Sequence, residues 1–189
     1  MIGVLLAVLC LVAATTQFPG GFDWNRDFVS TLLRGPAGPA RTLADIGVLL
    51  FCVSLATVFG RLAKLSIFSD SSKFIRIGGI GSQVYAAFTI TPMHDVMVTI
   101  SLVFLLVALI PMVRSLFIGG EKRFSVVGCV AVGLLGISAA IYYSSHLVTV
   151  LPWAQRVSFG ISAGWLVALD LNLPRGNAQP RRGEETKPH

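Results

Sequence analysis

The stretch VMVTISLVFLLVALIPMV, residues 96–113, contains no charged side chain and is followed directly by Arg114. A helix of about 20 apolar residues is long enough to cross the hydrocarbon core of a bilayer. Working outward from this stretch, we find five further hydrophobic runs of similar length: Ile2–Phe18, Leu43–Gly60, Phe74–Met93, Phe124–Ser145 and Val148–Leu171. The composition agrees, because 13% of the residues are charged, whereas a soluble domain carries about 25%. The sequence therefore predicts an all-α integral membrane protein built as a bundle of six transmembrane helices.

Positive charge alternates along the segments that connect these runs. The segments after the second, fourth and sixth runs are basic, whereas the short links after the third and fifth runs contain no Lys or Arg. The basic residues are Arg61, Lys64, Lys73 and Arg76, then Arg114, Lys122 and Arg123, and finally Arg175, Arg181, Arg182 and Lys187. Loops rich in Lys and Arg stay on the cytoplasmic side of a membrane. The pattern therefore predicts a multi-pass protein of the cell membrane with both termini in the cytoplasm.

The first run could also be the core of a signal peptide, but we expect it to be the first transmembrane helix. A signal peptide has a basic start and a cleavage site of small residues. Only Met1 precedes the apolar run, and Ala13-Ala14-Thr15 matches the cleavage pattern poorly.

Two classes of function find little support in the composition. The net charge of +6 lies at the edges of loops, where anionic lipid headgroups attract it, and no basic stripe alternates with aromatic residues as a nucleic-acid groove requires. The expected partners are therefore membrane lipids and not nucleic acid. Cys10, Cys52 and Cys129 lie in three different runs, so they are not spaced as a metal or redox pair, and we expect them to pack as small apolar groups.

We divide the chain into a transmembrane domain at 1–171 and a disordered cytoplasmic tail at 172–189. The external segment 22–34 is amphipathic, and we expect a short interfacial helix over Trp24–Leu33 with Asp23 as its N-cap. The apolar face of this helix would consist of Trp24, Phe28 and Leu32, and its polar face of Asp23, Asp27, Ser30 and Arg34.

Polar residues gather at the external ends of the predicted helices. Ionisable groups at membrane depth are costly unless they are paired or functional, so this set is the candidate ligand-binding site. Its members are Asp27, Ser30, Asp45, His94, Asp95, His146, Gln155 and Arg156.

One interpretation gives each of these residues a local structural role. Asp95 would cap the positive N-terminal end of the fourth helix, and His146 would stabilise the C-terminal end of the fifth. Arg156 would pair with Asp45 or Asp27. No ligand is needed in this case.

Two other interpretations involve a ligand. His94, His146 and a carboxylate such as Asp95 could bind zinc with a water molecule as fourth ligand, although no HExxH spacing is present; we expect no cofactor otherwise. Alternatively, the residues could form a polar pocket for a lipid headgroup, with Arg156 as the anion contact and a histidine as the titrating group. A hydrolase that uses Ser30 would be a special case, although Ser30 does not lie in a GxSxG motif.

The last run contains Gly160-Ile161-Ser162-Ala163-Gly164, which has the GxxxG spacing that lets membrane helices approach closely. Two uses fit this spacing. Gly160 and Gly164 could pack inside the bundle, or they could contact a partner protein or a second copy of the chain.

Three short motifs resemble the DUF998 family of uncharacterised six-helix membrane proteins. They are Asp27-Phe28-Val29-Ser30-Thr31-Leu32 after the first helix, Pro92-Met93-His94-Asp95 before the fourth, and Gln155-Arg156 with Trp165 in the sixth. The chain differs from the family pattern at Thr31, where the family has an acid, and at Leu33, where it tends to have Gly. A more distant resemblance is to the Frag1/DRAM/Sfk1 membrane proteins. The resemblance implies a six-helix fold and supplies no reaction.

Three functions follow from these observations. The leading hypothesis is a multi-pass membrane protein that binds a lipid headgroup or a partner at a polar pocket on its outer face. The alternatives are a membrane-embedded, metal-dependent hydrolase acting on a lipid, and a small transporter. No acidic residue sits at the centre of a run, which weighs against transport.

Overall fold

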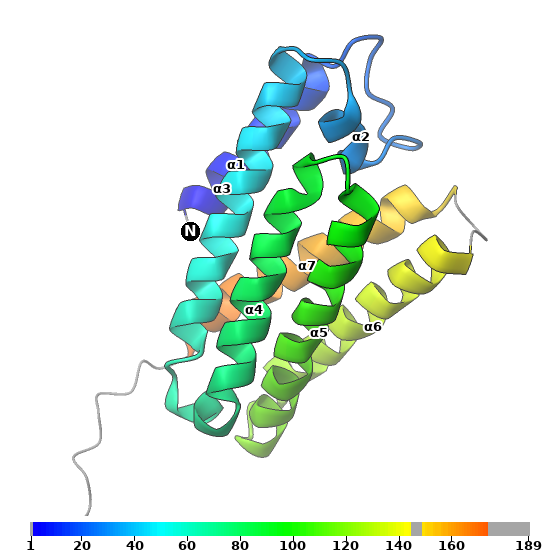
Figure 1. Ribbon diagram of the computed structural model, residues 1–189. Coiled ribbons are helices and arrows are strands. Elements are labelled where there is room, and N and C mark those ends of the chain that lie inside the picture. The colour runs from blue at the N-terminus through cyan, green and yellow to red at the C-terminus, as the bar shows by residue number, and fades with distance from the viewer. Residues whose placement is uncertain (1, 145–148, 174–189) are drawn as a thin grey trace, which may run out of the picture.

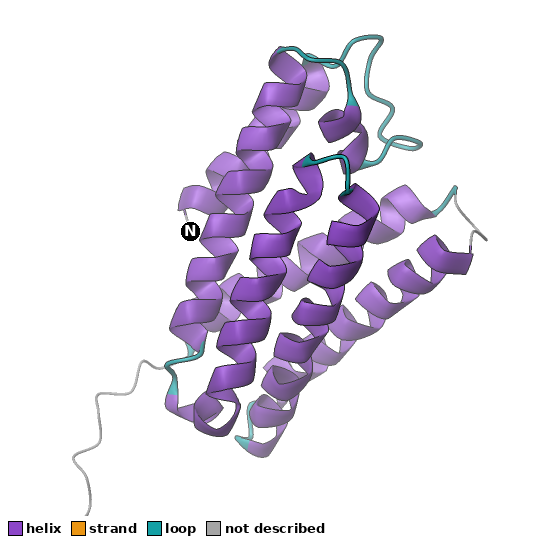
Figure 2. Ribbon diagram, viewed as in Figure 1, coloured by secondary structure: helices purple, strands orange, loops and turns teal. Residues whose placement is uncertain are grey.

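The computed structural model describes residues 2–144 and 149–173. Within these ranges the chain is all-α, with seven α-helices, two short 3-10 helices and no strand (Figures 1 and 2). In chain order the elements are α1 (Ile2–Thr16), α2 (Val29–Arg34), α3 (Pro39–Leu62), η1 (Ser66–Ser71), α4 (Ser72–Ala87), η2 (Phe88–Ile90), α5 (His94–Ile118), α6 (Lys122–Ser144) and α7 (Leu151–Asn172). Each of the six predicted runs therefore corresponds to one long helix.

The six long helices run up and down, and five of them close a ring. Each helix from α3 to α7 packs against the next, and α7 returns to contact α3. Helix α1 packs on the outside of this ring against α3, while α6 leans away from α5 toward the end that carries α2 (Figure 1). Short connections make the antiparallel order possible; in the α5–α6 turn, Gly120 adopts a φ of 84°, which a residue without Cβ allows at no steric cost.

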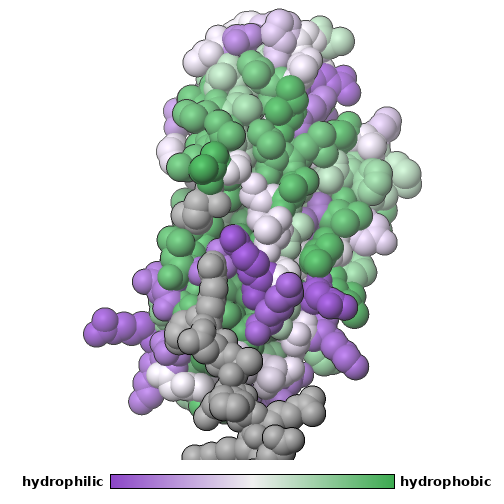
Figure 3. Space-filling view, turned by 90° about the vertical axis from the view of Figure 1, so that its left-hand side faces the viewer, coloured by the Kyte–Doolittle hydropathy of each residue, from purple (hydrophilic) through white to green (hydrophobic). Residues whose placement is uncertain are grey.

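Three of the helices, α3, α5 and α6, are long and apolar enough to cross a membrane. Helix α1 is apolar but has only 15 residues. Large hydrophobic side chains also face outward on the long helices, including Leu9, Val53, Ile110 and Ile137, and Figure 3 shows a broad hydrophobic band over one face of the molecule. Exposed apolar surface of this extent indicates contact with a membrane or another protein. The all-α fold and the membrane class agree with the prediction from sequence.

The charged residues divide between the two ends of the bundle. Seven described basic side chains lie at the end where α5 turns into α6, which we call the basic end; they are Arg61, Lys64, Lys73, Arg76, Arg114, Lys122 and Arg123 (Figure 1). All seven are exposed. The opposite end, which we call the α2 end, carries four described arginines, and each of them makes an ion pair or hydrogen bond within the protein.

The largest hydrophobic core occupies the half of the bundle nearest the basic end. Phe59 of α3, Phe68 of η1, Met112 of α5 and Leu166 of α7 are fully buried in it. The indole N–H of Trp165 donates a 2.8 Å hydrogen bond to the backbone carbonyl of Phe124, which ties α7 to the start of α6. This half of the structure is therefore held by packing that involves five helices.

Helix α4 packs closely because glycines face its neighbours. A Cβ at Gly78 would lie 2.7 Å from the carbonyl oxygen of Phe104 and 2.8 Å from the backbone nitrogen of Ala108, both in α5. A Cβ at Gly79 would collide with the ring of Phe59 in α3. Gly78 and Gly79 thus let one helix fit between two others.

The interfacial helix predicted over Trp24–Leu33 is shorter than expected. The helix α2 begins at Val29, and residues 24–26 form a turn. The side chain of Asp23 accepts a 2.8 Å hydrogen bond from the backbone N–H of Asn25, and the side chain of Asp27 accepts one of 2.8 Å from the N–H of Asp23. Such side-chain bonds stabilise a turn at the expense of a helix. Of the predicted apolar face, Leu32 is buried and Trp24 is about half exposed.

Two expectations about inward packing are also wrong. Gly160 and Gly164 are exposed, and a Cβ at either position would meet nothing within 4 Å, so this pair does not pack inside the bundle. Cys129 is exposed as well, although Cys52 is buried and Cys10 partly so. A contact of Gly160 and Gly164 with a partner or a second copy stays a prediction. The predicted disordered tail lies outside the described residues, apart from Asn172 and Leu173.

The close approach of α4 and α5 predicts a specific sensitivity to side-chain size. Gly78→Leu should lower the stability of the detergent-solubilised protein by about 1–3 kcal/mol or more, as overpacking of a tight contact does. Thermal unfolding followed by size-exclusion chromatography measures the change. Gly133→Leu on α6 is the matched control, since a Cβ there would meet nothing within 4 Å. Equal stability of the two variants would contradict the packing described.

Candidate functional site

Arg156 joins the first turns of α7 to the loop between α1 and α2. Its two terminal nitrogens donate hydrogen bonds to the backbone carbonyls of Trp24 and Asp27. The guanidinium carbon also lies 5.8 Å from the ring centroid of Phe22, 5.1 Å from that of Trp24 and 5.8 Å from that of Trp153. These distances are typical of cation–π contacts. Arg156 thus clamps the loop onto α7.

The loop presents its carbonyls to Arg156 because its acidic side chains bond to its own backbone. Asp23 and Asp27 accept the hydrogen bonds that shape the turn, and the hydroxyl of Thr31 accepts a 3.2 Å bond from the N–H of Phe28 just before α2. Arg156 therefore contacts Asp27 through its backbone carbonyl, and the predicted pairing with the Asp27 carboxylate is not among the ion pairs of the described residues.

A second polar group links α2, α5 and α6. Arg34 forms an ion pair of 2.7 Å with Asp95, and the two side chains are 56% and 62% exposed. The hydroxyl of Tyr142 approaches the same carboxylate. Asp95 lies in the first turn of α5, as the capping interpretation proposed, but the side chain that it contacts directly is Arg34.

Among the other predicted site residues, His94 and Asp45 have local partners. Nδ1 of His94 lies 2.8 Å from the carbonyl oxygen of Thr89 and so holds the turn between η2 and α5. Asp45 is 4.0 Å from Arg41 within α3, and its Oδ1 is buried without a hydrogen-bond partner among the described residues. Ser30 is half buried in α2.

The predicted residues that the structure describes therefore contact several different partners, and a site shared by all of them stays a prediction. Within 2–144 and 149–173, no group of three His, Cys, Asp or Glu side chains could hold a metal ion. His146, on which both the zinc site and the shared pocket depended, lies outside the described residues. The zinc site stays a prediction.

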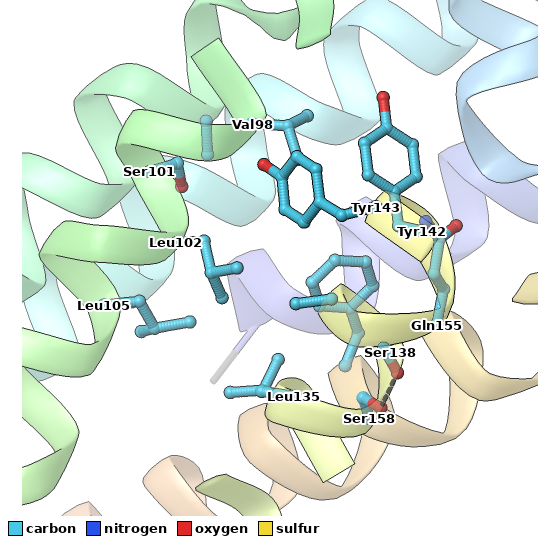
Figure 4. A pocket seen from close by; sticks show the side chains of 13 residues that line it. Val98, Ser101, Leu102, Leu105, Leu135, Ser138, Tyr142, Tyr143, Gln155 and Ser158 are labelled. Carbon is cyan, nitrogen blue, oxygen red and sulfur yellow. Dashed lines mark hydrogen bonds between the residues drawn. The ribbon is translucent and has the colours of Figure 1, made fainter. Parts of the chain in front are cut away.

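Gln155, the remaining predicted residue, lines a cavity of about 150 Å³ between α5, α6 and α7 (Figure 4). We call it the interhelical cavity. Its walls are mostly apolar, with Leu102 and Leu105 on α5, Leu135 on α6 and Phe159 on α7. It forms because α6 leans away from α5 toward the α2 end (Figure 1).

Two tyrosines close the cavity toward the α2 end. Tyr143 reaches from α6 to α5, where its hydroxyl lies 2.5 Å from that of Thr99. Tyr142, its neighbour, extends toward Asp95. Both rings line the cavity (Figure 4), so they bridge the gap that separates the two helices.

Polar groups lie on the α6–α7 side of the cavity. The hydroxyls of Ser138 and Ser158 are 2.8 Å apart, and that of Ser158 lies 2.6 Å from the carbonyl oxygen of Ala154. A serine hydroxyl carries a single proton. If Ser158 donates to Ala154, Ser138 donates to Ser158 and keeps a free acceptor position. Gln155 makes no hydrogen bond to any other described residue.

Sequence reasoning did not find this cavity. Ser138, Ser158 and the Tyr142-Tyr143 pair were weak signals, because each is a polar side chain in an apolar run and such residues usually face inward. Sequence reasoning also did not identify the ion pair between Arg61 and Asp170, whose nitrogen and oxygen are 2.6 Å apart. The Asp170 side chain is 4% exposed, and the pair joins α7 to α3 at the basic end. Both features depend on which helices are neighbours.

Comparisons with models of protein families, with curated proteins and with solved structures found no match. The description of the site therefore rests on the geometry of this chain.

The clamp on the loop predicts a specific effect of replacing Arg156. Arg156→Ala removes hydrogen bonds from a charged donor, each worth about 1.5–3 kcal/mol. Amides of residues 22–28 should then exchange with deuterium about tenfold faster or more, since about 1.4 kcal/mol corresponds to tenfold. Arg156→Lys should not restore protection, because a lysine cannot present two parallel donors.

Arg26→Ala is the control for this measurement. Arg26 is 3.8 Å from Asp23 and highly exposed, and such surface pairs contribute little. Exchange in the loop should therefore stay near that of the unmodified protein. Unchanged exchange in Arg156→Ala would show that the loop is held by other contacts.

Proposed function

We propose that this chain is a six-pass integral membrane protein that binds a membrane-derived amphiphile in the interhelical cavity. The observation that carries the proposal is the cavity itself, which is mostly apolar, contains a few polar groups and lies against α5 and α6, two helices long and apolar enough to span a membrane. Ligand sites in proteins typically combine apolar walls with a few polar groups that fix orientation.

The placement of charge supports six crossings with both termini in the cytoplasm. Seven described basic residues stand against three acidic ones, Asp70, Glu121 and Asp170, at the basic end. At the α2 end, four arginines stand against four aspartates. An excess of Lys and Arg marks the cytoplasmic side, so the α2 end would face outward.

The position of the cavity supports a ligand that comes from the bilayer. Tyr143 and Phe159 line it and are also exposed on the outside of the bundle. In a membrane this side of α6 and α7 would face lipid. A lipid chain could enter there without passing the polar loops at either end.

The resemblance to DUF998 proteins fits this proposal, because that family also has six helices. The more distant resemblance to the Frag1/DRAM/Sfk1 proteins fits it as well. Both remain proposals. Neither adds a reaction.

The topology predicts opposite accessibility for the two ends of the bundle. In a variant without Cys10, Cys52 and Cys129, Ala37→Cys near the start of α3 should react with a membrane-impermeant maleimide in intact cells. Ser69→Cys in η1 should react only after the cells are opened. Both side chains are exposed, so burial does not explain a difference. Labelling of position 69 in intact cells would overturn the orientation.

Lipid binding predicts that filling the cavity blocks capture of a lipid probe. Three probes with the same chain would be used in proteoliposomes: hexadecanol, hexadecanoic acid and hexadecane, each with a diazirine near one end. Ala139 lines the cavity, and the phenyl ring of Ala139→Phe would occupy the space that a lipid chain needs. The summed labelling of α5–α7 peptides should therefore fall about tenfold, which corresponds to a loss of about 1.4 kcal/mol in binding.

Ala140→Phe is the matched control, since Ala140 is the next residue on α6, is exposed and is not among the described residues that line the cavity. Its labelling should equal that of the unmodified protein. If no probe labels these peptides above the level of exposed segments, or if both variants label alike, the cavity does not bind lipid.

A further inference from the structure

We infer that the ligand of the interhelical cavity is a single-chain lipid alcohol, whose hydroxyl group enters the cavity and is recognised by Gln155. This inference rests on the proposed function, because it names the class of lipid for the same site.

The cavity excludes a large head group by its size. A cavity of about 150 Å³ holds a molecule the size of benzene, and the interhelical cavity has about this volume. It therefore has room for a small head and the first carbons of a chain. The rest of the chain would extend past Phe159 into the bilayer, because this side chain both lines the cavity and is exposed.

The lining also disfavours a charged head group. None of the described residues that line the cavity is a Lys, Arg, Asp, Glu or His. Tyr142 contacts Asp95 beyond the lining, and Asp95 pairs with Arg34. Arg156 uses its two terminal nitrogens on the carbonyls of the α1–α2 loop. A phosphate or carboxylate buried in the cavity would lack a described counter-charge, and an unpaired buried charge is costly.

The remaining hydrogen-bonding capacity matches a hydroxyl group. The side chain of Gln155 offers donors and an acceptor and makes no hydrogen bond to another described residue. Ser138, whose hydroxyl is turned toward Ser158 in Figure 4, retains an acceptor position on the α6–α7 side of the same cavity, while the side chain of Gln155 extends toward Tyr142. A hydroxyl can donate and accept at once, whereas an ester carbonyl only accepts and an alkane does neither.

The three photoreactive probes also test this inference, because they differ only in the head. The hexadecanol probe should label α5–α7 peptides about tenfold more than the hexadecanoic acid and hexadecane probes, as expected when hydrogen bonds worth about 1.4 kcal/mol distinguish them. Unlabelled hexadecanol should compete with this labelling.

Gln155→Met, which has a similar length and no amide, should reduce labelling by the hexadecanol probe to that of the hexadecane probe and leave the hexadecane labelling unchanged. Gln155→Leu should give the same result, and gel filtration in detergent confirms that each variant is folded before it is tested. Gln155→Asn, which shortens the side chain but keeps the amide, should retain part of the preference.

The outcomes separate the two proposals. If the acid probe labels as strongly as the alcohol probe, or if Gln155→Met keeps the preference for the alcohol, the inference of a lipid alcohol is wrong. The proposal of lipid binding is then still supported by a difference in labelling between Ala139→Phe and Ala140→Phe. If none of the probes labels the cavity, both proposals are wrong.

Discussion

The close packing of α4 between α3 and α5 is the constraint on which the rest of the bundle depends. Gly78 and Gly79 bring the three helices together, and the core around Phe59 and Met112 fixes α7 against them near the basic end. Since α5 and α6 are joined by a short turn at that end, their separation grows toward the α2 end (Figure 1). Tyr143 and Thr99 bridge the gap, and the interhelical cavity is what remains below this bridge.

Charge at the α2 end is neutralised within the protein. Arg34 pairs with Asp95, Arg41 lies near Asp45, and Arg156 bonds to loop carbonyls. This matters for orientation as well, because Arg26, Arg34 and, in the first turn of α3, Arg41 lie on the side predicted to be external. Pairing with acids at the same end leaves that side without an excess of positive charge, so these arginines are compatible with the positive-inside rule.

The sequence predicted the all-α class and a helix in each hydrophobic run, but not the contacts that the candidate site residues make. Helices such as α5 are strongly apolar over their whole length, and their ends agree with the runs to within a few residues. The helix expected over Trp24–Leu33 was wrong because Asp23 and Asp27 bond to the backbone of their own turn, a competition that side-chain periodicity does not register. Gln155 was predicted as a site residue, but for a polar outer pocket and with neighbours other than Ser138 and Tyr143.

By itself the sequence determined that the chain forms long apolar helices with basic residues at alternate connections, because hydropathy and charge are summed along the chain and need no knowledge of neighbours. Only the tertiary structure decided that Arg156 clamps a loop, that Gly160 and Gly164 face outward, and that Ser138, Tyr143 and Gln155 share a cavity. These features depend on the rotation of each helix about its axis and on the tilt between helices. Rotation and tilt are set by close packing between side chains that are distant in sequence. The hydropathy of one apolar segment does not show which other segment it will pack against.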